Sequence, residues 1–177
     1  MQPRVERIIK RQRGIAVEPF YNRVMDFALE FHVGKHGVAY NGISVFATSS
    51  TGAYTGNYVS DEPCLKRRIP EALQGYLSDV RKNLQRHLQN VYSQGYSGPL
   101  GVDMMVVEHK GEKYIHPCVE VNLRQTMGNV CVSLRSQLRR GAAIYRLRPV
   151  GETTEATLVL TPCAKRIEAV LQTEEAE

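Results

Sequence analysis

The chain has 177 residues, of which 42% are hydrophobic and 23% charged, a composition that suits one domain or two small lobes with a real core. Its formal net charge of +5 favours anionic partners such as nucleotides, but its basic residues are scattered and argue against a nucleic-acid-binding protein. The sequence shows no secretory leader, no apolar run of the ~18 residues that cross a bilayer, and no C-x-x-C pair, so we expect a cytoplasmic protein without a zinc site, whose cysteines are free and buried.

The first third of the sequence predicts one helix and a β-hairpin. Apolar residues on one side of residues 5–11 indicate the helix, and the apolar run at residues 15–17 is expected to form a short buried strand. Apolar runs on either side of a turn with two glycines predict the hairpin, with strands over residues 26–33 and 38–48. Residues 51–58 are expected to form a loop or an irregular strand.

The middle of the sequence predicts the clearest helix and a second hairpin. Leucines and valines recur at steps of three and four between Pro70 and Gly95, which indicates one amphipathic helix whose basic residues face solvent. Strands are predicted over residues 100–107 and 114–123, with a turn between them.

The last third of the sequence predicts shorter elements. A helix is expected over residues 128–139. Arg135 and Arg139 are four positions apart on it and face either the active site or solvent, of which solvent is favoured. Residues 157–160 are a strand candidate, and residues 164–171 are either a helix or a strand. The whole order predicts an α+β fold with a mostly antiparallel sheet packed against helices.

Polar side chains gather on the second hairpin. Because side chains alternate along a strand, Glu120, Asn122 and Arg124 share one face. If the two strands pair, Asp103 lies beside Glu120 or Asn122, and two carboxylates and an amide oxygen converge. Such oxygen ligands suit Mg²⁺. Considered alone, the alternation is also typical of the solvent-facing side of an ordinary sheet. The opposite face of the strand is apolar and is expected to be able to pack against the core: Val119, Val121 and Leu123.

The same hairpin resembles a known metal site. The segment Glu120-Val121-Asn122-Leu123-Arg124 resembles the Glu-x-Asn-x-Arg metal strand of the ATP-grasp superfamily, and Gly101-Val102-Asp103 resembles the strand that precedes it. The resemblance implies that Asp103, Glu120 and Asn122 bind one or two Mg²⁺ ions, and that Arg124 offsets charge on the transferred phosphoryl group. Seventeen positions separate Asp103 from Glu120, more than in many members, and His116-Pro117 is expected to mark a bulge or an edge strand.

The resemblance extends toward the N-terminus. Residues 15–20 resemble the hinge that contacts adenine in the family, which implies that the backbone near Glu18, Pro19 and Phe20 meets the base. Asp26 stands where the family places an acidic contact to the ribose. By this likeness residues 1–14 are a lead-in helix, residues 15–150 the nucleotide- and metal-binding lobe and residues 151–177 a C-terminal extension.

The resemblance implies an ATP- and Mg²⁺-dependent carboxylate ligase. In this family ATP phosphorylates a small carboxylate substrate, and an amine, a thiol or a similar nucleophile then attacks the acyl phosphate. The family's phosphate-binding lysine and glycine-rich loop have no counterpart in the roughly fourteen residues before the hinge. We therefore expect this chain to be the metal-binding part of the domain, to need an N-terminal lobe as partner, and to turn over little or nothing alone. The alternative is an inactive ATP-grasp-like scaffold or interaction module.

Overall fold

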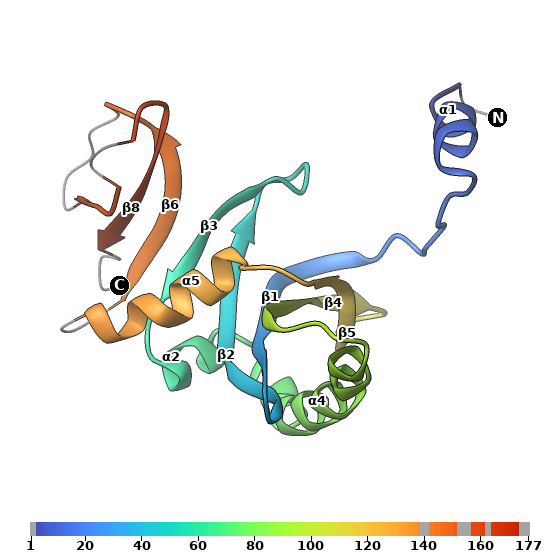
Figure 1. Cartoon of the computed structure of the whole chain (residues 1–177), viewed down its shortest axis with the longest axis horizontal. Helices are drawn as coiled ribbons and strands as arrows, with labels where there is room; N and C mark the ends of the chain where they lie inside the picture. The colour runs from blue at the N-terminus through green and yellow to red at the C-terminus, as the bar shows by residue number, and fades with distance from the viewer. Residues whose placement is uncertain (1–2, 139–141, 152–156, 162–163, 174–177) are drawn as a thin grey trace.

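A single antiparallel sheet organises the chain. The computed structural model describes residues 3–138, 142–151, 157–161 and 164–173. Eight strands lie in the order β5-β4-β1-β2-β3-β6-β8-β7, and each neighbouring pair is antiparallel (Figure 1). The strands are β1 (Asn22–Gly34), β2 (Gly37–Thr48), β3 (Tyr54–Val59), β4 (Gly98–His109), β5 (Glu112–Asn122), β6 (Ala143–Pro149), β7 (Thr157–Val159) and β8 (Ile167–Thr173). The predicted α+β class is confirmed.

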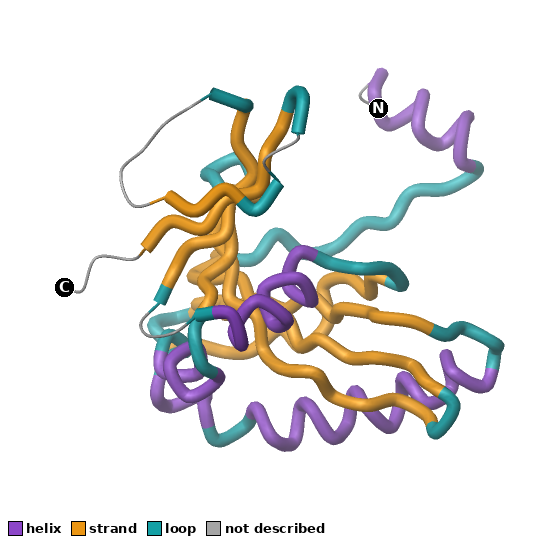
Figure 2. Tube along the Cα trace, turned by 60° about the vertical axis from the view of Figure 1, so that its left-hand side comes forward, coloured by secondary structure: helices purple, strands orange, loops and turns teal. Residues whose placement is uncertain are grey.

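Six helical segments accompany this sheet in the described residues. They are α1 (Pro3–Gln12), α2 (Glu62–Arg67), α3 (Glu71–Gln74), α4 (Leu77–Ser93), α5 (Met127–Leu134) and the 3₁₀ turn η1 (Arg135–Gln137). Figure 2 shows helices running alongside the strands, with the N-terminal helix apart from them. None of the described helices is long and apolar enough to cross a membrane.

The main core lies between the sheet and helices α2, α3 and α4. Alternation along β1 sends Phe27, Leu29 and Phe31 to this side, where they are at most 2% exposed. The helices contribute leucines to the same cluster, among them Leu65 and Leu88. The other face of β1 therefore carries the residues between these, which become the floor of the candidate site.

A smaller core lies beside α5, which packs mainly on strands β2 and β3. It joins Cys131 of α5 to Val59, Tyr145 and Leu171 from β3, β6 and β8. Strands β7 and β8 lie in the segment expected to be an extension, and they continue the same sheet.

Both predicted hairpins are confirmed, but the long predicted helix is broken. Helix α3 ends at Gln74 and α4 begins at Leu77, with Gly75 as the C-cap of α3. Leu73, Leu77 and Leu88 are buried as the spacing predicts. Arg81 is half-buried and lies over the Tyr40 ring at 5.0 Å, so the prediction that it faces solvent is wrong.

The N-terminal segment differs from the prediction for residues 15–17. Helix α1 forms as expected and ends at Gln12, but residues 14–21 run as an extended connection, with Val17 88% exposed. The expected buried strand is wrong because no described strand lies beside this segment to pair with it. Helix α1 stands apart from the sheet, and the described helix has no buried residue (Figure 1).

The cysteines differ in burial, although all were expected to be buried. Cys131 is buried and Cys64 is half-buried, but Cys118 is exposed on β5 at the edge of the sheet. All three are free thiols, and Cys163 lies outside the described residues. The prediction that the cysteines are buried is therefore wrong for Cys118, because no neighbouring strand covers the outer side of an edge strand.

Candidate metal and nucleotide site

Strands β4 and β5 bring three of the four predicted polar residues into direct contact. Asp103 pairs with Glu120, and Gly101 pairs with Asn122. Asn122 Nδ2 donates to Asp103 Oδ2 at 3.0 Å, and Arg124 Nη2 donates to Asn122 Oδ1 at 2.9 Å. Glu120 is exposed beside Asp103 in the register. The four residues therefore share one face of the sheet, at the end of the hairpin where β5 stops.

Negative charge is concentrated around Asp103. Burial raises the pKa of its carboxyl, the charge of Glu120 raises it further, and Asp26 adds a smaller effect. The charge of Arg124 and the hydrogen bond from Asn122 act in the opposite direction on this pKa. Repulsion between carboxylates is the condition that a bound cation relieves.

The donor set fits a hard divalent cation. The described residues contain no group of three or more His, Cys, Asp and Glu side chains arranged to hold a metal. What Asp103, Glu120 and Asn122 offer is two carboxylates and an amide oxygen. Mg²⁺ commonly takes one or two protein carboxylates and fills its other positions with phosphate and water, so this small set suits it.

The edge strand carries a pronounced irregularity. Between the pairs Asp103↔Glu120 and Met105↔His116, two steps along β4 are matched by four along β5. The bulge and the edge position expected at His116-Pro117 are confirmed. The expected packing of the apolar face of β5 is wrong, because β5 is the edge strand and the helices pack mainly on inner strands. These residues are 41–47% exposed: Val119, Val121 and Leu123.

The hinge-like residues lie beside a cleft of about 460 Å³. Glu18, Pro19 and Phe20 line one side of it, and Met105 and His116 come from the hairpin on another. The backbone of residues 14–21 is extended, which leaves its polar groups available to a ligand. The sequence had not indicated Met105 or His116, because only the register of the bulge brings them to this cleft.

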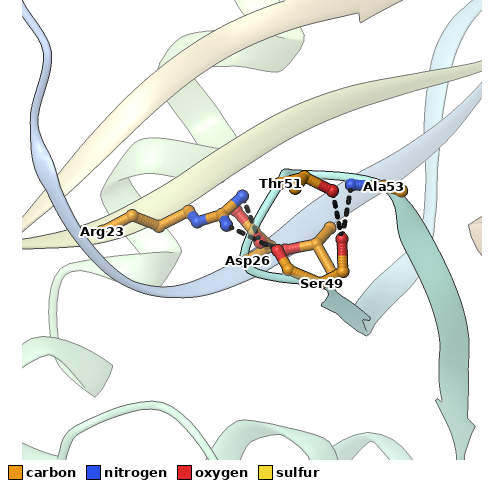
Figure 3. A network of polar contacts seen from close by, with 6 residues as sticks. Arg23, Asp26, Ser49, Thr51 and Ala53 are labelled. Atoms are coloured by element: carbon orange, nitrogen blue, oxygen red, sulfur yellow. Dashed lines mark hydrogen bonds and ion pairs between the residues drawn. The ribbon is translucent and has the colours of Figure 1, made fainter.

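Asp26 lies on the site face of β1 in a network of its own (Figure 3). Its Oδ2 is 3.2 Å from Arg23 Nη1 and accepts a hydrogen bond of 2.7 Å from Thr48 Oγ1. Arg23 also donates to the Ser49 carbonyl oxygen at 3.4 Å. Asp26 lines a neighbouring cavity of about 710 Å³ and does not line the cleft beside Glu18 to Phe20.

A buried carboxylate that the sequence analysis missed lies next to the metal residues. Glu30 is 1% exposed and accepts from Ser44 Oγ at 2.9 Å, Thr126 Oγ1 at 2.8 Å and Asn129 Nδ2 at 2.7 Å. Burial is the main cause that raises the pKa of Glu30 to about 7. One signal was available in the sequence, namely a glutamate between two apolar residues, Leu29 and Phe31, inside a predicted strand.

Two glycines make room for this carboxylate. A Cβ atom at Gly101 would lie 2.7 Å from Glu30 Oε2, and one at Gly128 would overlap both Glu30 Oε1 and Ser44 Oγ. The first turn of α5 therefore sits directly on the sheet, and the helix begins at Met127, three residues after Arg124.

Arg135 occupies the far end of α5 and does not face solvent. Its Nη1 is 3.9 Å from Glu62 Oε2, and its Nη2 donates to the Ile43 carbonyl oxygen. The expected solvent position is wrong because Gly42 leaves room for the guanidinium beside β2. Arg139 lies outside the described residues.

Solved structures place this architecture in a known fold. An Archaeoglobus fulgidus protein classed in the ATP-grasp superfamily superposes with a TM-score of 0.50 at 14% identity, over 87% of this chain. N5-carboxyaminoimidazole synthetase from Staphylococcus aureus, solved with ADP, gives 0.51 at 7% identity over 90%. Rhizobium etli pyruvate carboxylase gives 0.52 at 11% identity over 87%.

The chain has an ATP-grasp fold. The fold that the resemblance implied is thus confirmed. The chain spans less than half of each of the three structures, with 47%, 48% and 19% of their respective lengths covered. No family model and no curated protein sequence matches it.

Proposed function

We propose that this chain is the ATP- and Mg²⁺-binding part of a carboxylate ligase, centred on residues 15–150. The observation that carries the proposal is the contact chain from Asp103 through Asn122 to Arg124, with Glu120 opposite Asp103. The ATP-grasp fold supports it, because the structurally similar proteins include ligases and carboxylases. Because the chain covers less than half of those proteins, we propose that an N-terminal lobe completes the site.

The proposal gives roles to the predicted metal residues and to the hinge-like segment, and leaves Asp26 outside the cleft beside that segment. Asp103, Glu120 and Asn122 would hold Mg²⁺, which when bound neutralises phosphate charge. The extended segment from Glu18 to Phe20 would lie along one side of the adenine, and the cleft beside this segment is large enough for a purine base.

The proposed reaction is a phosphoryl transfer followed by an acyl transfer. A carboxylate oxygen of the substrate attacks the γ-phosphorus, the bond to the β,γ-bridging oxygen breaks, and ADP leaves. An amine or thiol then attacks the acyl carbon of the acyl phosphate and inorganic phosphate leaves. Arg124 Nη1 and Nη2 would stabilise negative charge on the transferred group, so the contribution of the chain is mainly positioning and charge neutralisation.

Calorimetry with Mg²⁺ and a nonhydrolysable ATP analogue tests the proposal. We expect Mg²⁺-dependent binding by the wild type, weakened at least ~10-fold by Glu120→Gln, since one ligand of a coordinated ion is commonly worth more than ~1.4 kcal/mol. Glu108→Gln is the matched control, because Glu108 pairs with Lys113 on the same hairpin away from the site and its loss should leave binding unchanged.

Two outcomes would contradict the proposal. If the folded chain binds no nucleotide, either alone or together with the proposed N-terminal lobe, the alternative of an inactive scaffold is favoured. Equal binding by wild type and Glu120→Gln would remove Glu120 from the site. In the complete protein, Glu120→Ala should abolish Mg²⁺- and ATP-dependent turnover.

A further inference from the structure

A cavity of about 390 Å³ lies on the site face, between the metal strands and the first turn of α5. Asp103, Asn122 and Arg124 form one wall, so anything bound in it lies next to the proposed metal ion. Its volume is within the roughly 300–1,000 Å³ of ordinary small-molecule sites. Among the described residues that line it, Arg124 is the one cationic side chain.

The hydroxyl groups in the cavity are already committed to other side chains. Ser44 and Thr126 donate to Glu30 at 2.9 and 2.8 Å. Thr48 donates to Asp26 at 2.7 Å, and Tyr54 donates to Asn57 Oδ1 at 2.6 Å. A hydroxyl of a ligand can donate to the oxygens of these groups, but it can accept from none of them unless an existing bond breaks, so several ligand hydroxyls would be only partly satisfied here.

The remaining walls are apolar or negatively charged. Ala28, Phe46 and Met127 offer carbon surface. Glu30 lies at the floor with its oxygens hydrogen-bonded to Ser44, Thr126 and Asn129, and the negative charge of Asp103 at the side would repel a second carboxylate on a ligand. A ligand that fits this cavity would therefore carry one anionic group beside Arg124, and the rest of the ligand would be apolar.

We propose that this cavity binds the substrate acid, and that the acid is a monocarboxylate with an apolar body. Its carboxylate faces Arg124 and the metal residues, and its carbon chain or ring lies against Phe46 and Met127. The inference rests on the proposed function, because it supplies the carboxylate that ATP would phosphorylate. The proposed substrates are therefore acids that carry neither a second charged group nor several hydroxyl groups.

Methyl NMR of the full chain, with ¹³C-methyl methionine, tests the proposal. The five methionines include Met127 in the cavity wall and Met104, which is 1% exposed in the opposite core and serves as an internal reference. With Mg²⁺ and the nonhydrolysable ATP analogue present, hexanoate and benzoate should shift the Met127 signal saturably and leave the Met104 signal in place. Gluconate and succinate should bind at least ~10-fold more weakly, matching a difference above ~1.4 kcal/mol.

Two variants determine the orientation. Arg124→Gln should weaken hexanoate binding at least ~10-fold, as expected for loss of a charge-assisted contact to the carboxylate. Arg86→Gln is the control, because Arg86 is exposed on α4 on the other side of the sheet. The proposal would be overturned if the Met127 signal does not shift with hexanoate and benzoate, or if succinate and gluconate shift it at the same concentrations as hexanoate and benzoate do.

The two proposals fail in different ways. If the chain binds the nucleotide analogue but Met127 does not respond to the acids, the cavity assignment alone is wrong. If Met127 responds to the acids but neither this chain nor the chain with its N-terminal lobe binds nucleotide, the proposed ligase function is wrong and the acid site stands. An unchanged hexanoate affinity in Arg124→Gln would overturn the placement of the carboxylate.

Discussion

Glu30 shows how a single side chain connects distant parts of this fold. Its carboxyl group joins β1 to β2 through Ser44 and to the start of α5 through Thr126 and Asn129. Burial, with a smaller contribution from Asp103, raises the pKa of Glu30 to about 7, while Ser44, Thr126 and Arg135 act to lower it. The folded protein therefore keeps a proton on Glu30 at a pH where the unfolded chain has lost it.

The stability of the chain should consequently depend on pH in a defined direction. Between about pH 4.5 and pH 7 the native state binds more protons at Glu30 than the unfolded state, so the free energy of unfolding falls as pH rises. Glu30→Gln cannot ionise and should remove this loss, which is on the order of 2–3 kcal/mol. Thermal unfolding of both proteins across this range measures it.

A matched control is available in the other half of the sheet. Glu168 is also buried, but it pairs with Arg148 at 2.8 Å. Glu168→Gln should leave the pH slope between 4.5 and 7 as in the wild type. Identical slopes for Glu30→Gln and the wild type would contradict the protonated state of Glu30.

At the scale of elements, α5 depends on its first residues. Thr126 is its N-cap, and the Oγ1 of Thr126 accepts from Asn129 N at 2.9 Å while donating to Glu30. A helix was predicted over residues 128–139, and the structure has α5 up to Leu134 followed by the 3₁₀ turn η1. The alternation along β5 correctly predicted which of its residues share a face. The contact between Thr126 and Glu30 could not be predicted, because it joins residues 96 positions apart and no local pattern records it.

Removing the hydroxyl of Thr126 tests the role of the cap. Thr126→Val keeps the shape but loses the cap and leaves Glu30 with one donor fewer, so we expect a loss of about 1–3 kcal/mol in the free energy of unfolding. Thr126→Ser retains the hydroxyl and should recover most of the loss. Urea denaturation of the three proteins decides it, and equal midpoints for Val and Ser would refute the cap.

On the scale of the whole molecule, stability is expected to reside in the sheet and its two cores. Alternation and helical spacing predicted the α+β class, both hairpins and the four polar residues at the end of β5. They failed for residues 15–17 and for the apolar face of β5, because the burial of an apolar run depends on which element lies beside it. Strand order, which makes β5 an edge, is a property of the assembled sheet.

Helix α1 should contribute little to this stability. Because the described helix buries no residue, deletion of residues 1–12 is expected to change the free energy of unfolding by less than about 0.5 kcal/mol. Leu65→Ala, at 1% exposure in the main core, should cost about 2–5 kcal/mol. Calorimetric melting compares the two, and a large loss on deletion would show that α1 packs on the sheet in solution.

The close approach of Gly128 to Glu30 has a consequence for the evolution of the chain. A side chain at position 128 needs the space that the Glu30 carboxyl and the Ser44 hydroxyl now fill. Substitution at 128 is thus tolerable only with a shorter residue at position 30, and the two sites should change together across homologues. The pair Glu30 and Gly128, ninety-eight positions apart, should therefore help to recognise homologues whose sequences have otherwise diverged.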